Sequence, residues 1–306
     1  MIDRFTPIHD PNDPRIEPYR DQKDAWLKAA HNPDAIASDD TEADSVSEGL
    51  FISEGSLVLE HHISSRYPLH SVLIAENRVE SLGDLLKTIP SDVPIYTAPR
   101  LILDAITGYP IHRGLLACGY RLPQPTQTEF EELIEASRAL VILEDLSNHD
   151  NLGSVFRSVA ALAGAGVPVL LSPRCCDPLY RKSLRVSMGH ALTIPYAVMN
   201  NWPSALTTIK EAGFELLALT PASEASDIDQ IVLKSSKTTK FALLFGAEGP
   251  GLSEMAMDIA HQRVKIPLVS SADSLNISVS AAVALHRLIP PMEHSPLIEH
   301  YPEGHQ

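Results

Sequence analysis

The sequence predicts an α/β protein of two layered domains, the second of which is built on a parallel sheet. Segments with strand character alternate with segments of helical periodicity from about residue 48 to residue 290. After residue 139 the strand segments are continuous apolar runs, which is typical of parallel strands buried on both faces. A break rich in proline and polar residues, PQPTQT at 123–128, separates the two alternating stretches.

Residues 1–47 are predicted to form an acidic N-terminal extension that is partly disordered. The stretch DAIASDDTEADSVS at 34–47 has the acidic, low-complexity composition of a mobile segment. The preceding YRDQKDAWLKAA is compatible with a short helix. At the other end, the proline-rich ending of the chain predicts a disordered tail over residues 292–306.

A small α/β domain is expected over residues 48–123. Its predicted strands are GLFISEG, LHSVLIAEN, VPIYTAP and a closing GLLACGYRL. Its predicted helices are SLVLEHHISSR with Ser56 as its cap, VESLGDLLKTI and RLILDAITG. Residues 124–138 are then expected to be a linker.

The second domain is expected over residues 139–291. Its predicted strands are ALVILED, VPVLLS, FELLALT, KFALLFG and VKIPL, with helices between them. The stretch SLNISVSAAVALHRLI is the last predicted helix.

Composition narrows the classes of protein to consider. No apolar run reaches the roughly 18 residues that a membrane span needs, and the N-terminus lacks the basic-then-apolar layout of a signal peptide. The three cysteines cannot form a disulfide framework, and Cys175 and Cys176 have no further cysteine at a metal-ligand spacing. We therefore expect a cytoplasmic protein with no membrane partner and no metal site.

Net charge argues against a nucleic-acid partner at first sight, because it is −15. The acidic residues are concentrated near the start: residues 1–54 hold thirteen Asp and Glu against five Lys and Arg, while residues 139–290 hold thirteen against twelve. The stretch RCCDPLYRKSLR is locally basic, with Arg174, Arg181, Lys182 and Arg185. Screening over about 10 Å allows such a patch to bind phosphates on an acidic protein, although a solvated face is the alternative.

The helix expected after ALVILED carries an arginine away from its apolar stripe. Arg157 lies one turn after Gly153, and helical side chains lean toward the N-terminus. Arg157 is thus expected to extend over Gly153 toward the helix start, where Asn151 is the predicted N-cap and where a parallel sheet opens into a ligand crevice. From spacing alone, a capped helix with a surface arginine is the favoured interpretation.

Two later stretches end a strand and carry ligand-type residues. LLFGAEGPGLSE at 243–254 has three glycines around Glu248, with neither the P-loop nor the dinucleotide-binding spacing. IPLVSSADSLNISVSAA at 266–282 enters a helix through Ser, Asp and Asn, which indicates either a helix cap or polar groups around a ligand.

Taken in order, these three stretches resemble the SpoU/TrmH branch of the SPOUT RNA methyltransferases. The first motif of that branch, Asn-x-Gly-x-x-x-Arg, is matched by Asn151, Gly153 and Arg157. The glycine loop is matched by Gly246, Glu248, Gly249, Gly251 and Leu252, and the third motif by Ile266, Pro267, Ser274, Leu275, Asn276 and Ser278. RVSMG at 185–189 also fits, and the resemblance covers about residues 139–290.

The first domain is similar, more loosely, to the substrate-binding domain of ribosomal protein L30e type that precedes some members. The segments EGLFISEG and IHRGLLA carry this likeness, and the acidic insertion at 34–47 departs from it.

The resemblance implies a deep trefoil knot in the second domain, S-adenosyl-L-methionine as cofactor and a homodimer. It implies cofactor contacts from Gly246, Glu248, Gly249, Ile266, Leu275 and Asn276. Its implied catalytic residues are Arg157, Asn151, Ser274 and Asn276, which would transfer a methyl group to a ribose 2′-hydroxyl of RNA.

A guanidinium with a pKa above 12 is a poor general base. For this reason Arg157 is expected to bind the adjacent phosphate and stabilise the developing alkoxide. Arg174, Arg181, Lys182 and Arg185 are the expected RNA contacts, with ribosomal RNA favoured over transfer RNA. The alternative is a non-catalytic RNA-binding or ribosome-assembly protein on the same scaffold. A dinucleotide-binding oxidoreductase is excluded, because the spacing of Gly246, Gly249 and Gly251 does not match its glycine motif.

Overall fold

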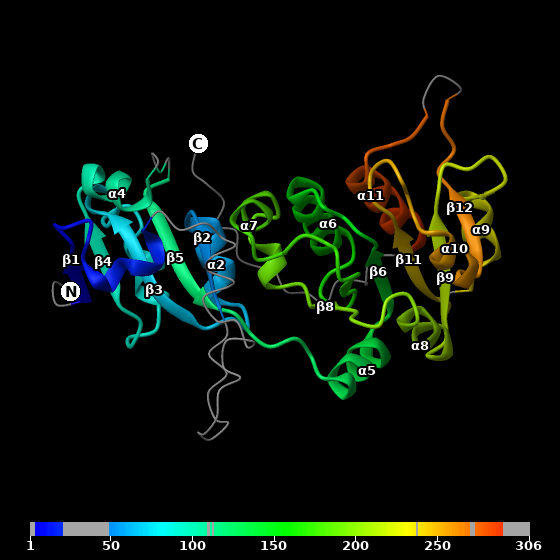
Figure 1. The fold of residues 1–306 in the computed structure, drawn as a ribbon, viewed down its shortest axis with the longest axis horizontal. Coiled ribbons are helices and arrows are strands. Elements are labelled where there is room, and N and C mark those ends of the chain that lie inside the picture. Colours follow the sequence, from blue (N-terminus) through cyan, green and yellow to red (C-terminus); the bar gives the residue numbers. More distant parts are fainter. Residues whose placement is uncertain are drawn as a thin grey trace, which may run out of the picture.

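The computed structural model describes residues 4–20, 49–108, 111, 113–236, 238–269 and 273–289. The expected mobile stretch 34–47, most of the short helix before it, and the tail 292–306 lie outside these residues. Within the described ranges the chain forms two sheets, each covered by helices (Figure 1). The predicted fold class, α/β with a parallel sheet in the second domain, is confirmed.

The first sheet has five strands in the order β1-β4-β3-β5-β2. Its strands are β1 (Phe5–Pro7), β2 (Leu50–Glu54), β3 (Leu69–Ala75), β4 (Ile95–Ala98) and β5 (Leu115–Tyr120), with β5 antiparallel to both neighbours. Its helices are α2 (Ser56–Ile63), α3 (Gly83–Thr88) and α4 (Arg100–Thr107), with 3-10 turns η2 (Pro14–Tyr19) and η4 (Glu76–Arg78). Gly55, at φ 97°, takes the N-cap position of α2 that was expected for Ser56.

The first domain begins well before the expected boundary at residue 48. β1 pairs in parallel with β4 along the edge of the sheet, and Ile8, Ile16 and Tyr19 are buried in its core. The expected N-terminal extension is thus part of this domain over residues 5–19. A three-residue strand among prolines is too short to show a period of two, which explains why the sequence pattern missed it.

The second sheet has seven strands in the order β10-β12-β9-β11-β6-β7-β8, all paired in parallel. They are β6 (Ala139–Leu143), β7 (Val169–Leu171), β8 (Tyr196–Val198), β9 (Phe214–Leu219), β10 (Ser226–Asp227), β11 (Lys240–Phe245) and β12 (Gln262–Lys265). The pattern had indicated five of these strands and missed the short β8 and β10. The expected knot stays a prediction, because residues 270–272 lie outside the described ranges.

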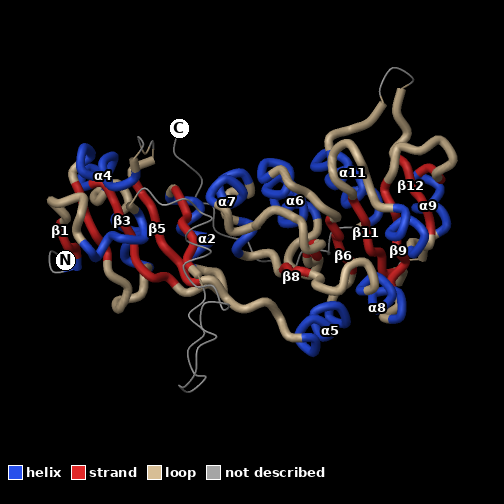
Figure 2. The backbone as a smooth tube through the Cα atoms, in the orientation of Figure 1, coloured by secondary structure: helices blue, strands red, loops and turns tan. Residues whose placement is uncertain are grey.

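Helices cover both faces of this sheet, as the continuous apolar strands predict. They are α6 (His149–Leu162), α7 (Arg181–Val186), α8 (Ala205–Glu211), α9 (Ile228–Lys234), α10 (Glu254–Ile259), α11 (Ile277–Leu288) and the turn η5 (His190–Leu192). In β6, Val141 and Leu143 join the core under α6 and α11, while Leu140 and Ile142 face α8 and α10. Figure 2 shows α6 and α11 on one side and α8 on the other. No helix in the described residues is long and apolar enough to cross a membrane.

The expected linker at 124–138 contains a helix, α5 (Gln127–Ala136). Thr126 and Glu129 form a reciprocal capping box at its start. Phe130 and Ile134 are buried against the second sheet. The capping residues and the i, i+4 apolar pair were visible in the sequence, so this expectation was wrong for a recognisable reason: proline and polar content outweighed helical periodicity.

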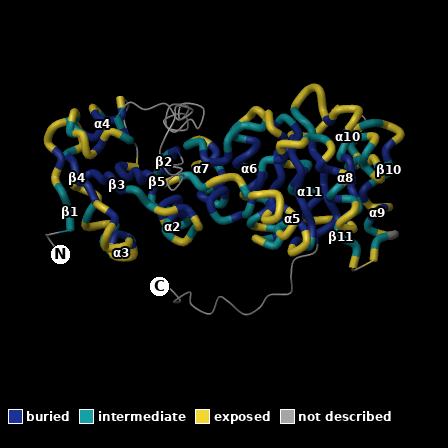
Figure 3. The backbone as a smooth tube through the Cα atoms, turned by 60° about the horizontal axis from the view of Figure 1, so that its bottom comes forward, coloured by how far each residue is buried: buried dark blue, intermediate teal, exposed yellow. Residues whose placement is uncertain are grey.

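One hydrophobic cluster spans both domains. Phe51, Val58 and Tyr67 of the first domain belong to the same buried cluster as Tyr196 and Leu184 of the second. An ion pair of 2.6 Å joins Arg121 to Asp177 across this junction, and the two side chains are only 13% and 15% exposed. Figure 3 shows the junction between β2, β5 and α7 as largely buried backbone. The first domain is therefore packed against the second and is not joined to it by a flexible linker alone.

Gly153 lies where α6 crosses α7. A Cβ atom there would lie 2.7 Å from the carbonyl oxygen of Ser183 and 2.9 Å from Cβ of Val186. Gly153 is thus the close-approach point of two helices, and α7 covers it. The expectation that Arg157 extends over an open Gly153 is wrong for this reason.

Replacing Gly153 with Ala should lower the free energy of unfolding by about 1–2 kcal/mol. Overpacking of about 1–3 kcal/mol outweighs the gain of roughly 0.5–1 kcal/mol that Ala brings to a helix. Denaturant unfolding of the whole chain measures this. Gly166→Ala is the matched control, since the nearest atoms to its Cβ would be 3.9 Å away. Unchanged stability in Gly153→Ala would mean that α7 shifts without cost.

Candidate functional site

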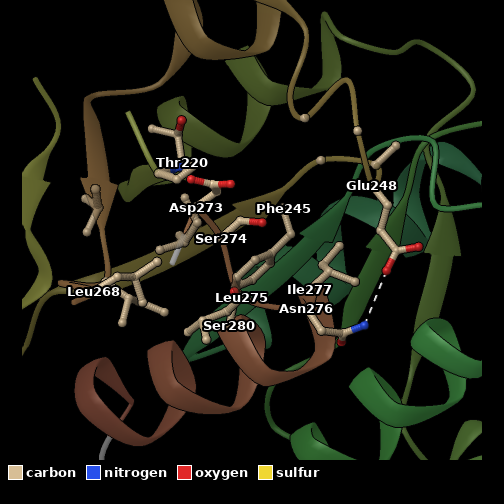
Figure 4. A pocket seen from close by; sticks show the side chains of 18 residues that line it. Thr220, Phe245, Glu248, Leu268, Asp273, Ser274, Leu275, Asn276, Ile277 and Ser280 are labelled. Carbon is tan, nitrogen blue, oxygen red and sulfur yellow. Dashed lines mark hydrogen bonds between the residues drawn. The ribbon is translucent and has the colours of Figure 1, made fainter. Parts of the chain in front are cut away.

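A cavity of about 560 Å³ opens where β9, β11 and β12 end and α11 begins. This is the carboxyl edge of the parallel sheet, where crevices in such folds bind ligands. All six residues predicted to contact a cofactor line it: Gly246, Glu248, Gly249, Ile266, Leu275 and Asn276. Ser274, predicted to be catalytic, also lines it (Figure 4).

Several lining residues were not predicted from the sequence. Thr220 and Pro221 follow β9, Phe245 ends β11, and Asp273 and Ser280 flank the start of α11. Figure 4 shows Asp273 near Thr220, on the side of the cavity away from Glu248. Of these residues, only Thr220 and Pro221 belong to none of the three sequence motifs. Their position directly after a parallel strand was the only feature of the sequence that could have indicated a ligand contact.

The glycine loop after β11 folds back tightly on itself. A Cβ atom on Gly246 would collide with the backbone of Gly251 and Leu252. Gly251 N donates a hydrogen bond of 2.9 Å to Ala247 O, and Gly249 and Gly251 have φ values of 89° and 75°. These conformations favour glycine, which has no Cβ atom to clash. The loop therefore presents backbone, with few side chains, to the cavity.

Three side chains from the three sequence motifs meet beside the cavity. Asn151 Nδ2 donates to Glu248 Oε1 at 2.6 Å. Asn276 Nδ2 donates to Asn151 Oδ1 at 3.0 Å and to the same Glu248 oxygen at 3.3 Å. Figure 4 shows the Asn276–Glu248 bond. Residues 125 positions apart are thereby joined into one network.

Asn276 has a second role at the start of α11. Its Oδ1 accepts hydrogen bonds from the backbone N of Ser278 at 2.8 Å and from its hydroxyl at 2.6 Å. The helix cap predicted from this stretch is present. Because the carbonyl of the amide caps the helix, the amino group must face Asn151 and Glu248.

Asn151 is not the N-cap that its position suggested. Asn148 takes that role, accepting a hydrogen bond of 2.8 Å from Asp150 N. Asn151 lies inside α6 and is 6% exposed. Its side chain bonds instead to residues of the two later motifs. The expected N-cap role was wrong, because a helix start can hold several Asn or Asp residues and only geometry identifies the cap. The catalytic role expected for Asn151 stays a prediction.

Glu144, at the end of β6, was missed. It is 3% exposed; one carboxylate oxygen accepts a 2.9 Å hydrogen bond from Trp202 Nε1, and the other accepts one of 2.8 Å from Ser253 N. Ser253 in turn caps α10. The glycine loop is thus held at Glu248 by the network and just beyond its far end by Glu144.

Arg157 does not line the cavity. It is exposed on α6, about 9 Å further along the helix axis than Asn151 at 1.5 Å per residue. Within the described residues its side chain forms no hydrogen bond or ion pair. It lies near His190 on η5, whose ring is 4.5 Å from that of His61 in the first domain. Burial, with smaller contributions from His61 and the Arg157 charge, lowers the pKa of His190.

The four predicted RNA-binding residues lie on two elements. Arg174, in the loop after β7, forms an ion pair with Asp145, and that contact lowers the pKa of Asp145. Arg181, Lys182 and Arg185 belong to α7, where Lys182 pairs with Asp150 at 2.6 Å. Arg185 is exposed. The structure does not gather all four into one patch of unpaired charge.

Cys175 donates its thiol proton to Leu143 O at 3.2 Å, and burial raises its pKa. In the ranges that the structure covers, no group of three or more His, Cys, Asp or Glu is arranged to hold a metal ion.

Comparisons with known proteins agree with this geometry. The SpoU rRNA Methylase family matches residues 138–286. An "uncharacterized tRNA/rRNA methyltransferase" of Mycobacterium tuberculosis is 36% identical over 279 residues, covering 91% of this chain and 90% of that protein.

Two solved structures share the fold. An AdoMet-bound rRNA methyltransferase from Sinorhizobium meliloti has a TM-score of 0.69 at 19% identity, covering 93% of this chain and 97% of that one. A structure described as an RNA 2′-O ribose methyltransferase has a TM-score of 0.63 at 22% identity, covering 92% and 97%. With its three motifs joined at one cavity, the chain belongs to the SpoU rRNA Methylase family.

Proposed function

We propose that this protein is an RNA methyltransferase that uses S-adenosyl-L-methionine to methylate a ribose 2′-hydroxyl. The observation that carries the proposal is the network of Asn151, Glu248 and Asn276, which brings all three motifs to one cavity. The M. tuberculosis relative is described as a tRNA/rRNA methyltransferase, and one structural neighbour as a ribose 2′-O enzyme. Both support the same reaction class.

The cavity fits the proposed cofactor. Its volume of about 560 Å³ lies within the usual range for small-ligand sites. Phe245, Ile266 and Leu275 supply apolar surface for an adenine ring, and the glycine loop supplies backbone amides and carbonyls. Asp273 and Glu248 place negative charge near a ligand that carries a sulfonium and an ammonium group.

Six residues would hold the cofactor: Gly246, Glu248, Gly249, Ile266, Leu275 and Asn276. When bound, the cofactor supplies an electrophilic methyl group on sulfur. The chain must then align a ribose hydroxyl and stabilise its oxygen as the proton leaves. Ser274 and Asn276, at the cavity rim, are the residues we assign to positioning the ribose.

Arg157 is assigned to the RNA, not to the cofactor, because it lies outside the cavity lining. Its guanidinium remains charged throughout. It would bind the phosphate next to the target ribose and stabilise the alkoxide that develops. Its freedom from internal hydrogen bonds within the described residues leaves all its donors available for that contact.

Ribosomal RNA is the substrate class we propose, in keeping with the S. meliloti neighbour, which is described as an rRNA methyltransferase. Arg174, Arg181, Lys182 and Arg185 would contact its phosphates, with Arg174 and Lys182 leaving Asp145 and Asp150 to do so. The alternative of a non-catalytic RNA-binding or ribosome-assembly protein predicts RNA retention without methyl transfer.

Incubation with radiolabelled cofactor and total bacterial RNA tests the proposal. The wild-type protein should transfer label to RNA, and Arg157→Ala should reduce transfer by about 100- to 1,000-fold, the usual cost of losing one charge-stabilising group. Cofactor affinity, measured by calorimetry, should stay unchanged. Lys87→Ala, an exposed cation on α3, is the control. Equal transfer by Arg157→Ala would remove the assignment of this residue.

The hydrogen-bond network predicts coupled effects on cofactor binding. Glu248→Ala removes the acceptor of the Asn151 amide and leaves Asn276 Nδ2 bonded to Asn151 alone, so cofactor affinity should fall by about tenfold or more. Adding Asn151→Ala should cost less than in wild type, with a coupling energy of about 0.5–3 kcal/mol. Glu211→Ala, an exposed carboxylate on α8, is the control. Strict additivity would show that the three side chains do not act together.

We also propose a homodimer whose interface includes α11. Val279 on this helix is 47% exposed and Leu275 just before it is 37% exposed, an apolar surface beside the cavity. Light scattering should then give twice the chain mass of 33.4 kDa, and Val279→Asp should shift it toward the monomer. A wild-type protein that scatters as a single chain would contradict the proposal.

A further inference from the structure

The side chains that line the cavity include acidic groups and no basic ones. Among the described residues of the lining, Glu248 and Asp273 are acidic, and none is a lysine, an arginine or a histidine. A cleft whose walls carry one sign of charge concentrates the field and attracts the opposite sign. The lining therefore favours a ligand, or the part of a ligand, that is positively charged.

The two carboxylates differ in how far other side chains already occupy them. Glu248 Oε1 accepts hydrogen bonds from Asn151 at 2.6 Å and from Asn276 at 3.3 Å. Asp273 forms no hydrogen bond or ion pair with any residue in the described ranges, and it is exposed at the cavity. Asp273 can thus pair with a ligand without giving up a partner in the protein.

The surroundings of Asp273 suit the end of a ligand that carries both a cation and an anion. Figure 4 shows Asp273 near Thr220, across the cavity from Glu248 and Asn276. Thr220 Oγ1 accepts a hydrogen bond of 3.3 Å from Ala222 N, and its own proton has no acceptor in the described ranges. A carboxylate and a free hydroxyl donor therefore lie on the same side of the cavity.

The proposed cofactor has two positive groups, and they differ in what they can bond to. The sulfonium in the middle of S-adenosyl-L-methionine has no hydrogen to donate. The ammonium at its amino-acid end donates three hydrogen bonds, like that of a lysine. Because charge-assisted hydrogen bonds are the stronger kind, a carboxylate with no protein partner is better matched to the ammonium than to the sulfonium.

We propose that Asp273 binds the ammonium group of S-adenosyl-L-methionine and so places the amino-acid end of the cofactor beside Thr220. The proposal rests on the proposed function and deepens it, because it names the residue that distinguishes this cofactor from other adenosine compounds. The hydroxyl of Thr220 then faces the carboxylate of the same end. The apolar side chains of Phe245, Ile266 and Leu275 remain for the adenine.

Calorimetric titration of the full chain with three ligands tests the assignment. S-adenosyl-L-methionine carries both positive groups, S-adenosylhomocysteine carries only the ammonium, and methylthioadenosine carries neither. Asp273→Asn should weaken binding of the first two by about three- to tenfold, the effect of losing one partly solvated ion pair. Its affinity for methylthioadenosine should equal that of the wild type, which also shows that the cavity is intact.

Two further variants separate this contact from a general effect of charge. Asp258→Asn removes the same charge from an exposed position on α10 outside the cavity lining, and all three affinities should stay unchanged. Asp273→Glu keeps the carboxylate and should bind the first two ligands more tightly than Asp273→Asn does.

The outcomes distinguish this contact from the proposed function. If the three ligands behave as stated but the wild type transfers no methyl group to RNA, the proposed function fails and the assignment of Asp273 stands. If the wild type methylates RNA and Asp273→Asn binds all three ligands as tightly as the wild type, the assignment is overturned. Weaker binding of methylthioadenosine would place the carboxylate at the adenosine end, and weaker binding of S-adenosyl-L-methionine alone would place it at the sulfonium; either result overturns the assignment.

Discussion

The shape of the cavity depends on one small hydrogen-bond network. Glu248 Oε1 accepts from two amides, and Asn151 both donates and accepts. Asn276 uses its carbonyl to cap α11 and its amino group to reach the other two. Two amides and one carboxylate supply the donors and acceptors that these bonds need. Substituting Glu248 leaves the buried Asn151 amide without its acceptor, and substituting Asn276 leaves Asn151 Oδ1 without its donor.

The network is matched by a second anchor at the opposite end of the glycine loop. The backbone of the loop turns back between Gly246 and Gly251. These internal contacts hold the turn itself but do not attach the loop to the rest of the domain. Glu144 holds Ser253, and through it the start of α10, from the end of a central strand. A loop anchored at both ends leaves its middle backbone free to face a ligand. Preorganised backbone groups of this kind bind without a large ordering cost.

Much of this arrangement could be predicted from sequence, and the failures have physical causes. Continuous apolar strands predicted the parallel sheet, and one residue from each motif, Asn151, Glu248 and Asn276, joins the network. Arg157 lies outside it. Strand register and the identity of a helix cap could not be predicted in this way, because several similar residues compete for the same position. Asn148 and Asn151 are both suitable caps, and the pattern chose the wrong one. Gly153 looked like an opening, since the sequence cannot show that α7 crosses there. Glu144 carries no motif at all; only its burial and its two partners identify it.

The shared core changes what the first domain can contribute. A tethered RNA-binding domain raises local concentration but leaves geometry free. Here Phe51 and Tyr67 pack in the same cluster as Tyr196, and Arg121 pairs with Asp177 where both are largely buried. Separating the domains would expose that cluster to water and would leave the charges of Arg121 and Asp177 without their partners. The side chains of the first domain, His61 beside His190 among them, are thus part of the architecture around Arg157. Any ligand that reaches Arg157 must fit a surface that both domains define together.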